Sequence, residues 1–200
     1  IFDVGFAEPS DTESDAYFAE AISTAQNVIL ASDLTAVDDG FMTGVIETRP
    51  FVEFEDAGAR VGLAGVDQDN DRVIRYFPSF KGTLSSVAAG IEDVPEERSK
   101  IINYVGEDHT FDYISYYQFF LENGIEEGAI ENKYVLIGLD VKATPDVQQS
   151  QVDAFPTPYT RFNARLSPGV EVHANMLQNL LNEGWISNPP TQQKVILLLF

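Results

Sequence analysis

The sequence predicts an α/β fold: a single domain with a mixed, largely parallel sheet flanked by helices. Short apolar segments rich in β-branched residues alternate along the chain with segments whose apolar residues recur at helical spacing. The 200 residues contain 44% apolar residues, which is ample for a packed core. No internal repeat, low-complexity tract or heptad pattern is visible. Alternating strands and helices of this kind favour helices packed on the faces of one sheet.

The first half of the chain is expected to begin with a strand, a helix and a second strand. Residues 1–6 form the first strand, and residues 27–32 form a short apolar strand with β-branched content. Ser10 and Glu13 form a capping box for the helix between them, which is expected to bury Tyr17, Phe18, Ala21, Ile22 and Ala25. The elements expected next are a loop at 34–49, a helical turn at 51–58 ended by Gly58, a buried strand at 60–66, a turn at 67–71 and a strand at 72–80 that forms a hairpin with the strand at 60–66.

In the second half, residues 133–140 (KYVLIGLD) give the clearest strand signal. Val135, Leu136 and Ile137 form a continuous apolar run, as expected of a strand buried on both faces. We therefore expect a central strand here, in the same sheet as residues 27–32. The elements expected before it are a helix at 82–91, a solvent turn at 95–99, a strand at 101–106 and a short aromatic helix at 113–121 packed through Ile114, Tyr117, Phe120 and Leu121.

A last helix is expected over residues 168–183. Ser167 is a good N-cap, and Pro168 fits the first helical position because its missing N–H would be unpaired there. Gly184 can supply the left-handed residue that ends the helix. Apolar residues at steps of four, three and four predict the buried face, and polar residues predict the wetter side: Val170, Ala174, Leu177 and Leu181 against Glu171, Asn175 and Gln178.

Charge and composition limit the partners. The chain carries 32 acidic and 12 basic residues, a net charge of −20, which repels the phosphate backbone of nucleic acids. We therefore expect no nucleic-acid partner. The absence of cysteine excludes disulfides, thiolate metal sites and cysteine nucleophiles.

Signatures of catalysis or metal binding are also missing. Residues 67–72 (DQDNDR) resemble the start of a calcium loop, but Arg72 and Pro78 stand where an EF-hand needs Gly and Glu. We expect a solvated turn there, with Arg72 and Arg75 paired to neighbouring acids. His109, in a polar loop, is expected to be solvated. No phosphate loop, nucleophile elbow or zinc motif is present, so no catalytic residue, metal or cofactor is predicted.

Several motifs carry a resemblance to a known family. FDVGFAEP, DNDRVIRYFPSF, KYVLIG and DAFPTP followed by PGVEVHAN occur in that order from residue 2 to residue 175. In wording and spacing they resemble the type 2 CHASE domain, an extracytoplasmic sensor module. Two departures stand out. The first strand and helix of that family are missing upstream, and the connection between Asp140 and Asp153 is longer and more polar than expected.

The resemblance implies a division of the chain and a function. Residues 1–188 are expected to form a CHASE-like extracytoplasmic sensor domain without its N-terminal part, and residues 189–200 to begin a transmembrane helix. The other interpretation of that end is a buried strand or surface tail. The implied protein is a bacterial inner-membrane receptor with its sensor in the periplasmic or extracellular space. It would sense a small-molecule or ionic signal and form a homodimer. Its cytoplasmic output module would be an adenylate, guanylate or diguanylate cyclase, or a histidine or serine/threonine kinase. The alternative is a soluble α/β hydrolase that uses carboxylates.

The candidate ligand site follows from the strand ends. Ligands of α/β sheets gather beyond the carboxyl ends of the strands, which here carry Asp3, Asp33 and Asp140. His173 is either a core residue satisfied by hydrogen bonds or a pH sensor paired with Asp153 or Asp140. Likewise, the motif from residue 153 to residue 175 is either sensory or architectural. The candidate ligand-binding residues are Asp140, Asp153, Thr157, Glu171, His173 and Asn175.

Overall fold

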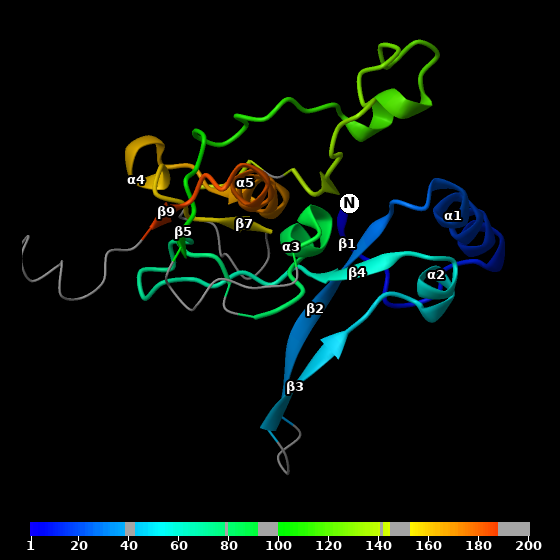
Figure 1. The fold of residues 1–200 in the computed structure, drawn as a ribbon, viewed down its shortest axis with the longest axis horizontal. Helices are drawn as coiled ribbons and strands as arrows, with labels where there is room; N and C mark the ends of the chain where they lie inside the picture. Colours follow the sequence, from blue (N-terminus) through cyan, green and yellow to red (C-terminus); the bar gives the residue numbers. More distant parts are fainter. Residues whose placement is uncertain (39–42, 79, 92–99, 141, 145–152, 188–200) are drawn as a thin grey trace, which may run out of the picture.

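A five-stranded sheet lies at the centre of the fold (Figure 1). The computed structural model describes residues 1–38, 43–78, 80–91, 100–140, 142–144 and 153–187. The strands of this sheet are β1 (Phe2–Gly5), β2 (Ile29–Asp38), β3 (Thr43–Thr48), β4 (Arg60–Leu63) and β6 (Ile137–Gly138). β1 runs parallel to β2 and β6, β4 runs parallel to β2, and β3 is antiparallel to the end of β2. The mixed, largely parallel sheet of a single α/β domain is therefore confirmed.

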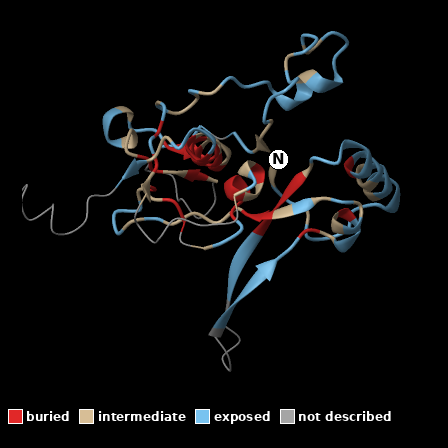
Figure 2. Ribbon diagram, in the orientation of Figure 1, coloured by how far each residue is buried: buried red, intermediate tan, exposed pale blue. Residues whose placement is uncertain are grey.

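Helices cover both faces of the sheet because alternate residues of β2 point to opposite sides. Leu30 packs with Ile22 of α1 (Thr12–Ala25) and Phe54 of α2 (Val52–Asp56). Ile29 and Ala31 pack on the other side, with residues of α3 (Leu84–Ala89) and α5 (Gly169–Asn182). Figure 2 shows the buried residues concentrated on α3, α5 and the adjoining strands, whereas α1 is mostly exposed.

The capping of α1 differs from the expected capping box. Asp11 is the N-cap, and its carboxylate accepts a hydrogen bond from Ser14 N at 2.9 Å. Ser10 instead donates its hydroxyl to Asp15 at 2.8 Å. Of the five residues expected to be buried by this helix, Ile22 alone is fully buried, and Tyr17 is 65% exposed.

Two shorter helices agree with the sequence. α2 lies within the helical turn expected at 51–58, and Gly58 follows it with φ of 104°. Within the segment 82–91, α3 begins after Thr83, whose hydroxyl accepts from Ser86 N, and ends at Gly90 with φ of 69°. Thr83 and Gly90 are the capping residues that such a short helix requires.

The expectation of a loop at 34–49 is wrong. β2 continues to Asp38 and pairs with β3, with Asp33 opposite Thr48. Val45 and Ile46, on β3, are 65% and 57% exposed. Because neither of these adjacent residues is buried, the segment lacks the inward–outward alternation that marks a half-buried strand.

The expectation of a hairpin between residues 60–66 and 72–80 is also wrong. β4 pairs in parallel with β2, and residues 73–78 form an extended segment that bonds to other parts of the chain. Ile74 N donates to Pro156 O at 2.9 Å, and Tyr76 forms an isolated bridge with Ile101. The predicted pairing of Arg75 is confirmed, because it binds Asp69 and Asp71 at 2.9 and 2.7 Å.

β6 is not the central strand expected at 133–140. Among the described strands it pairs with β1 alone, which places it at the edge of the sheet, and its regular part is two residues long. Residues 135–138 are half-buried. A Cβ added to Gly138 would overlap Val170 of α5, so the close approach of this helix covers the strand from one side.

The aromatic segment before β6 is exposed. It contains the 3-10 helix η1 (Tyr116–Phe120) and projects away from the sheet (Figure 1). Tyr113 and Phe120 are each 72% exposed. The expected packing of this segment through Ile114, Tyr117, Phe120 and Leu121 is therefore wrong, because all four are exposed.

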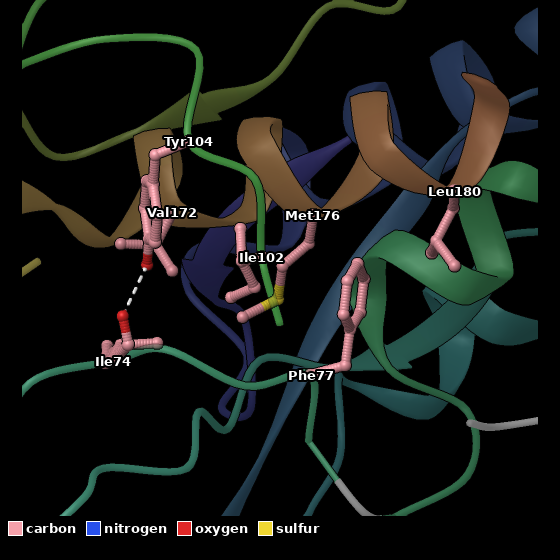
Figure 3. Packing of buried hydrophobic residues seen from close by; sticks show 7 residues of the cluster. All are labelled: Ile74, Phe77, Ile102, Tyr104, Val172, Met176 and Leu180. Atoms are coloured by element: carbon pink, nitrogen blue, oxygen red, sulfur yellow. Dashed lines mark hydrogen bonds between the residues drawn. The ribbon is translucent and has the colours of Figure 1, made fainter. Parts of the chain in front are cut away.

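The C-terminal half packs around α5. Its remaining short elements are β5 (Lys100–Ile101), β7 (Ala154–Phe155), α4 (Thr160–Asn163), β8 (Ser167–Pro168) and β9 (Ile186–Ser187). Figure 3 shows the core in which three residues of α5 meet two extended segments: Ile74, Phe77, Ile102, Tyr104, Val172, Met176 and Leu180. The Tyr104 hydroxyl donates to Ile74 O at 3.1 Å, which satisfies its polar atom within this core.

The buried face of α5 is rotated from the expected one. Leu177 is buried as predicted, but Leu181 is 44% exposed and Asn175, expected on the wetter side, is 5% exposed. The helix begins at Gly169 with Pro168 as N-cap, so Ser167 belongs to β8. Glu183, with φ of 50°, is the left-handed C-cap in place of Gly184.

Two expectations lie outside the described residues: the solvent turn at 95–99 and the start of a transmembrane helix at 189–200. Within the part of the chain that the structure describes, no helix has both the length and the apolar character needed to cross a membrane.

Candidate functional site

A cleft of about 660 Å³ opens at the carboxyl ends of β1, β2 and β4. This is the edge at which parallel α/β sheets bind ligands, and the volume lies within the range of small-molecule sites. The cleft is lined by Asp3, Val4, Gly5, Phe6, Ala7, Ala31, Ser32, Asp33, Leu34, Thr48, Arg49, Ala64, Gly65, Val66, Asp67, Phe80, Asp153, Phe155 and His173. Seven separate segments of the chain therefore contribute to it.

Three of the lining carboxylates influence one another. Burial and the charge of Asp33 raise the pKa of Asp3 to about 6. Burial, followed by the charge of Asp3, raises the pKa of Asp153 to about 6 as well. The charge of Asp33 thus makes ionisation of Asp3 and Asp153 more costly, because like charges repel strongly where water is partly excluded. The cleft thus concentrates negative charge at the strand ends.

His173 enters the cleft from α5 and is 3% exposed. Its Nε2 lies 3.0 Å from Ala64 O and 3.8 Å from Asp3 Oδ1. Because a carbonyl oxygen accepts only, Nε2 carries the proton and Nδ1 is left as an acceptor. Burial lowers the pKa of His173 to about 4, so the ring is neutral at neutral pH. A residue that lines the cleft therefore has a buried acceptor without a partner among the described residues, and it does not neutralise the carboxylates.

Three buried polar atoms around the cleft have no hydrogen-bond partner among the described residues: Asp3 Oδ2, Ser32 Oγ and His173 Nδ1. Buried polar atoms in folded proteins are nearly always paired, and each unpaired one costs about 1–3 kcal/mol. Asp3, Ser32 and His173 come from β1, β2 and α5. Their convergence on one cleft singles it out as the candidate site.

The side chain of Asp153 lies against Gly169, the first residue of α5. A Cβ on Gly169 would overlap both oxygens of its carboxylate, so glycine allows Asp153 to lie against the first turn of the helix. The Gly169 amide also donates to Asp153 O at 3.1 Å. These contacts explain why Asp153 and Gly169 occur together in the motif.

The polar residues of α5 hold an extended segment of the chain. Glu171, Asn175 and Asn179 lie four residues apart and accept hydrogen bonds from the backbone N–H groups of Thr110, Val105 and Asn103 at 2.9, 3.0 and 2.8 Å. Asn179 also donates to Asn103 O at 3.0 Å. We call these three residues the polar stripe of α5. The polar stripe therefore accepts hydrogen bonds that a neighbouring β-strand would otherwise accept from the backbone of the segment 103–110.

Asp140 lies in a separate cluster. His109 Nε2 is 2.8 Å from Asp140 Oδ1, and His109 Nδ1 is 3.1 Å from Asp108 Oδ2. Partial burial lowers the pKa of His109, but the hydrogen bonds to Asp108 and Asp140 outweigh it, so the pKa is raised. The expectation that His109 is simply solvated is therefore wrong.

Thr157 is 2% exposed and lies within the loop that joins β7 to α4. Its amide donates to Thr160 Oγ1 at 2.9 Å, and its hydroxyl lies 3.4 Å from Ser167 Oγ. These bonds hold the proline-rich loop against β8 and the start of α4.

The structure divides the six candidate residues of the sequence into groups. Asp153 and His173 line the cleft, Glu171 and Asn175 belong to the polar stripe, and Asp140 pairs with His109. Their role in ligand binding stays a prediction. The sequence places Asp3 at the ligand edge of the sheet without making it a candidate, and it does not point to Ser32. In the structure both residues lie within strands, at the second position of β1 and the fourth position of β2.

The described residues hold no group of three or more histidine, aspartate or glutamate side chains arranged to bind a metal ion. A ligand-sized cleft at the carboxyl edge of a parallel sheet is typical of α/β ligand-binding domains. The family model of the CHASE2 domain matches residues 1–200, and the chain belongs to this family. CHASE2 domains are extracellular sensor domains of signalling receptors. The comparisons with curated proteins and with solved structures gave no match.

Proposed function

We propose that the chain is the extracytoplasmic sensor of a bacterial transmembrane receptor that controls a cytoplasmic cyclase or kinase. Membership of the CHASE2 family supports the sensor role. The apolar residues 195–199 support a membrane segment after the domain. The expected homodimer stays a prediction, which sedimentation of the purified receptor would test.

The observation that carries the proposal is the set of unpaired buried atoms in the cleft. Asp3 Oδ2, Ser32 Oγ and His173 Nδ1 lack partners among the residues described, and all three residues line a space large enough for a small molecule. A bound ligand that supplied hydrogen bonds to these atoms would remove their desolvation cost. Binding would then be coupled to the packing of the strands and of α5.

α5 supports a route from the cleft to the C-terminal segment. His173 in its second turn lines the cleft, and the helix ends at Asn182, shortly before the residues that lead to 189–200. Ser85 Oγ donates to His173 O at 3.1 Å, so α3 also contacts the helix at this level. A shift of α5 on ligand binding would therefore be passed to β9 (Ile186–Ser187), and from β9 to the segment that follows.

One observation favours the alternative, a hydrolase that uses carboxylates. Asp3 and Asp153 line one cleft, and burial raises the pKa of each to about 6, where a carboxyl group can act as a general acid or base. The sensor remains the better supported proposal because the chain belongs to a sensor family.

Blocking the cleft in the full-length receptor tests the proposal. Ala7 is exposed and lines the cleft, whereas Ala16 is exposed on α1 outside it. Ala7→Cys and Ala16→Cys variants, each in a receptor free of other cysteines, would be labelled with fluorescein maleimide. Output would be measured as cyclic nucleotide formation or autophosphorylation. Labelling of Ala7→Cys is expected to change output severalfold and labelling of Ala16→Cys to leave it unchanged. Equal output from both labelled variants would contradict the proposal.

A further inference from the structure

The aspartates and the histidine that line the cleft offer hydrogen-bond acceptors and few donors. Asp3, Asp33 and Asp153 present carboxylate oxygens, and His173 Nδ1 is an acceptor because Nε2 is committed to Ala64 O. Carboxylates and an unprotonated ring nitrogen accept hydrogen bonds and donate none. The unpaired atoms of Asp3 and His173 are thus both acceptors, and Ser32 Oγ can serve as either partner. A ligand that satisfies them must be rich in N–H or O–H donors.

The charge of the cleft favours a cation. Arg49 is the one basic side chain among the described lining residues, and its guanidinium is already engaged. It binds Glu55 at 3.1 and 2.7 Å and Glu47 at 3.1 Å, outside the group of aspartates. His173 is neutral at neutral pH because burial lowers its pKa to about 4. Asp3, Asp33 and Asp153 therefore lack a cationic partner among the described lining residues, and the net charge of −20 attracts cations to the whole surface.

The wall of the cleft favours an organic cation. Phe6, Val66, Phe80 and Phe155 line the same space as the aspartates. Aromatic rings bind apolar groups and also attract cations to their faces. A volume of about 660 Å³ is much larger than a single ion needs. The presence of both acceptors and phenylalanines in one cleft matches a molecule with an ammonium group and an apolar body.

We propose that the cleft binds an organic amine, with its ammonium group among Asp3, Asp153 and His173 and its apolar body against Phe6, Phe80 and Phe155. An ammonium group offers three donors and no acceptor. The proposal rests on the proposed function and deepens it by naming the class of ligand. Asp33 contributes charge at the rim, since it is exposed and its Oδ1 accepts from Leu34 N at 2.7 Å.

Calorimetric titration of the 200-residue chain tests the proposal. The probes would be phenethylammonium, cyclohexylammonium and 1,5-diaminopentane, each at near-neutral pH. Matched controls keep the body and remove or invert the charge: 2-phenylethanol is neutral, and 3-phenylpropionate is an anion. At least one amine is expected to bind with one-to-one stoichiometry, and the corresponding alcohol at least about tenfold more weakly.

Variants locate the binding. Asp3→Asn keeps the shape of the side chain and removes its charge, and Asp112→Asn removes the same charge at an exposed position outside the cleft. Asp3→Asn should weaken amine binding at least about tenfold, and Asp112→Asn should leave it unchanged. Circular dichroism and thermal unfolding of each variant would show that it is folded. The conservative variant Asp153→Asn gives a second, independent loss of charge at the site.

Several outcomes would overturn the proposal. Binding of Ca²⁺ or Mg²⁺ that depends on Asp3, without binding of any amine, would make the cleft a metal site. Equal binding of an amine and its alcohol would show that charge is not recognised. Failure of all three amines to bind would exclude the class. The proposed function would survive each of these results if labelling of Ala7→Cys still changed receptor output, so the two failures are distinguishable.

Discussion

The carboxylate of Asp153 occupies the space that a side chain on Gly169 would need. The two residues are also joined through the backbone, since Gly169 N donates to Asp153 O at 3.1 Å. Asp153, which lines the cleft, is therefore in direct contact with the first turn of α5. A movement of Asp153 on ligand binding would displace the first turn of this helix.

Gly169→Ala should destabilise the domain although alanine favours helices. Replacing a helical glycine by alanine normally stabilises by about 0.5–1 kcal/mol. Here the new Cβ would overlap the Asp153 carboxylate, so we expect a net loss of stability of about 1–3 kcal/mol. Gly184→Ala is the control, because its Cβ would lie 4.0 Å from the nearest atom. Urea denaturation measures both, and a stabilised Gly169→Ala variant would refute the contact.

The polar stripe of α5 should be essential for stability. Asn175→Ala removes the acceptor of Val105 N and leaves that half-buried group unpaired, at a cost of about 1–3 kcal/mol. Gln178→Ala, on the partly exposed side of the same helix, should change stability by less than about 0.5 kcal/mol. Chemical denaturation of the two variants gives the comparison. Equal effects would show that the segment 103–110 is not held by the stripe.

Two leucines of α5 should differ in importance. Leu177 is 3% exposed and packs with Leu84 and Ala88 of α3, so Leu177→Ala should cost about 2–5 kcal/mol. Leu181 is 44% exposed, and Leu181→Ala should cost less than about 1 kcal/mol. Thermal unfolding of both variants tests the observed rotation of the helix. A larger loss of stability for Leu181→Ala than for Leu177→Ala would indicate that the buried face is the one expected from the sequence.

Asp3→Asn should stabilise the domain at neutral pH. The folded state raises the pKa of Asp3 from 3.8 to about 6, so the folded chain binds a proton in this window that the unfolded chain does not. Stability from this group is therefore full below about pH 4, falls as the pH rises to about 6, and stays low above that. Asparagine avoids the loss, which we put at about 2–3 kcal/mol.

Urea denaturation of Asp3→Asn and the parent chain at about pH 4.5 and near neutrality measures this effect. The advantage of the variant should shrink at the lower pH, where Asp3 itself is protonated. Asp112→Asn, at an exposed site, should show no such change. A variant less stable than the parent at neutral pH would mean that the Asp3 charge has a partner in the folded state.

The sequence predicts the α/β class and the approximate span of α1, α3 and α5, because both depend on the local spacing of apolar residues. The caps expected at Ser10, Ser167 and Gly184 are each displaced by one residue, to Asp11, Pro168 and Glu183. The polar stripe was missed for the opposite reason. Asn179 binds a backbone amide 76 residues away, and a helical wheel counts such an asparagine as solvent-facing. His109 was misread in the same way, because Asp140 lies 31 residues further along the chain.

Nitrogen-detected NMR of the two histidine rings tests the central claim most directly, because the chain contains only His109 and His173. His173 should appear as the neutral tautomer with its proton on Nε2 and should not titrate until the pH falls to about 4. Its Nδ1 signal should move when a binding amine is added, while His109 should not respond. A His173 that titrates at its ordinary pKa, or whose Nδ1 signal is unmoved at amine saturation, would contradict the account of the cleft.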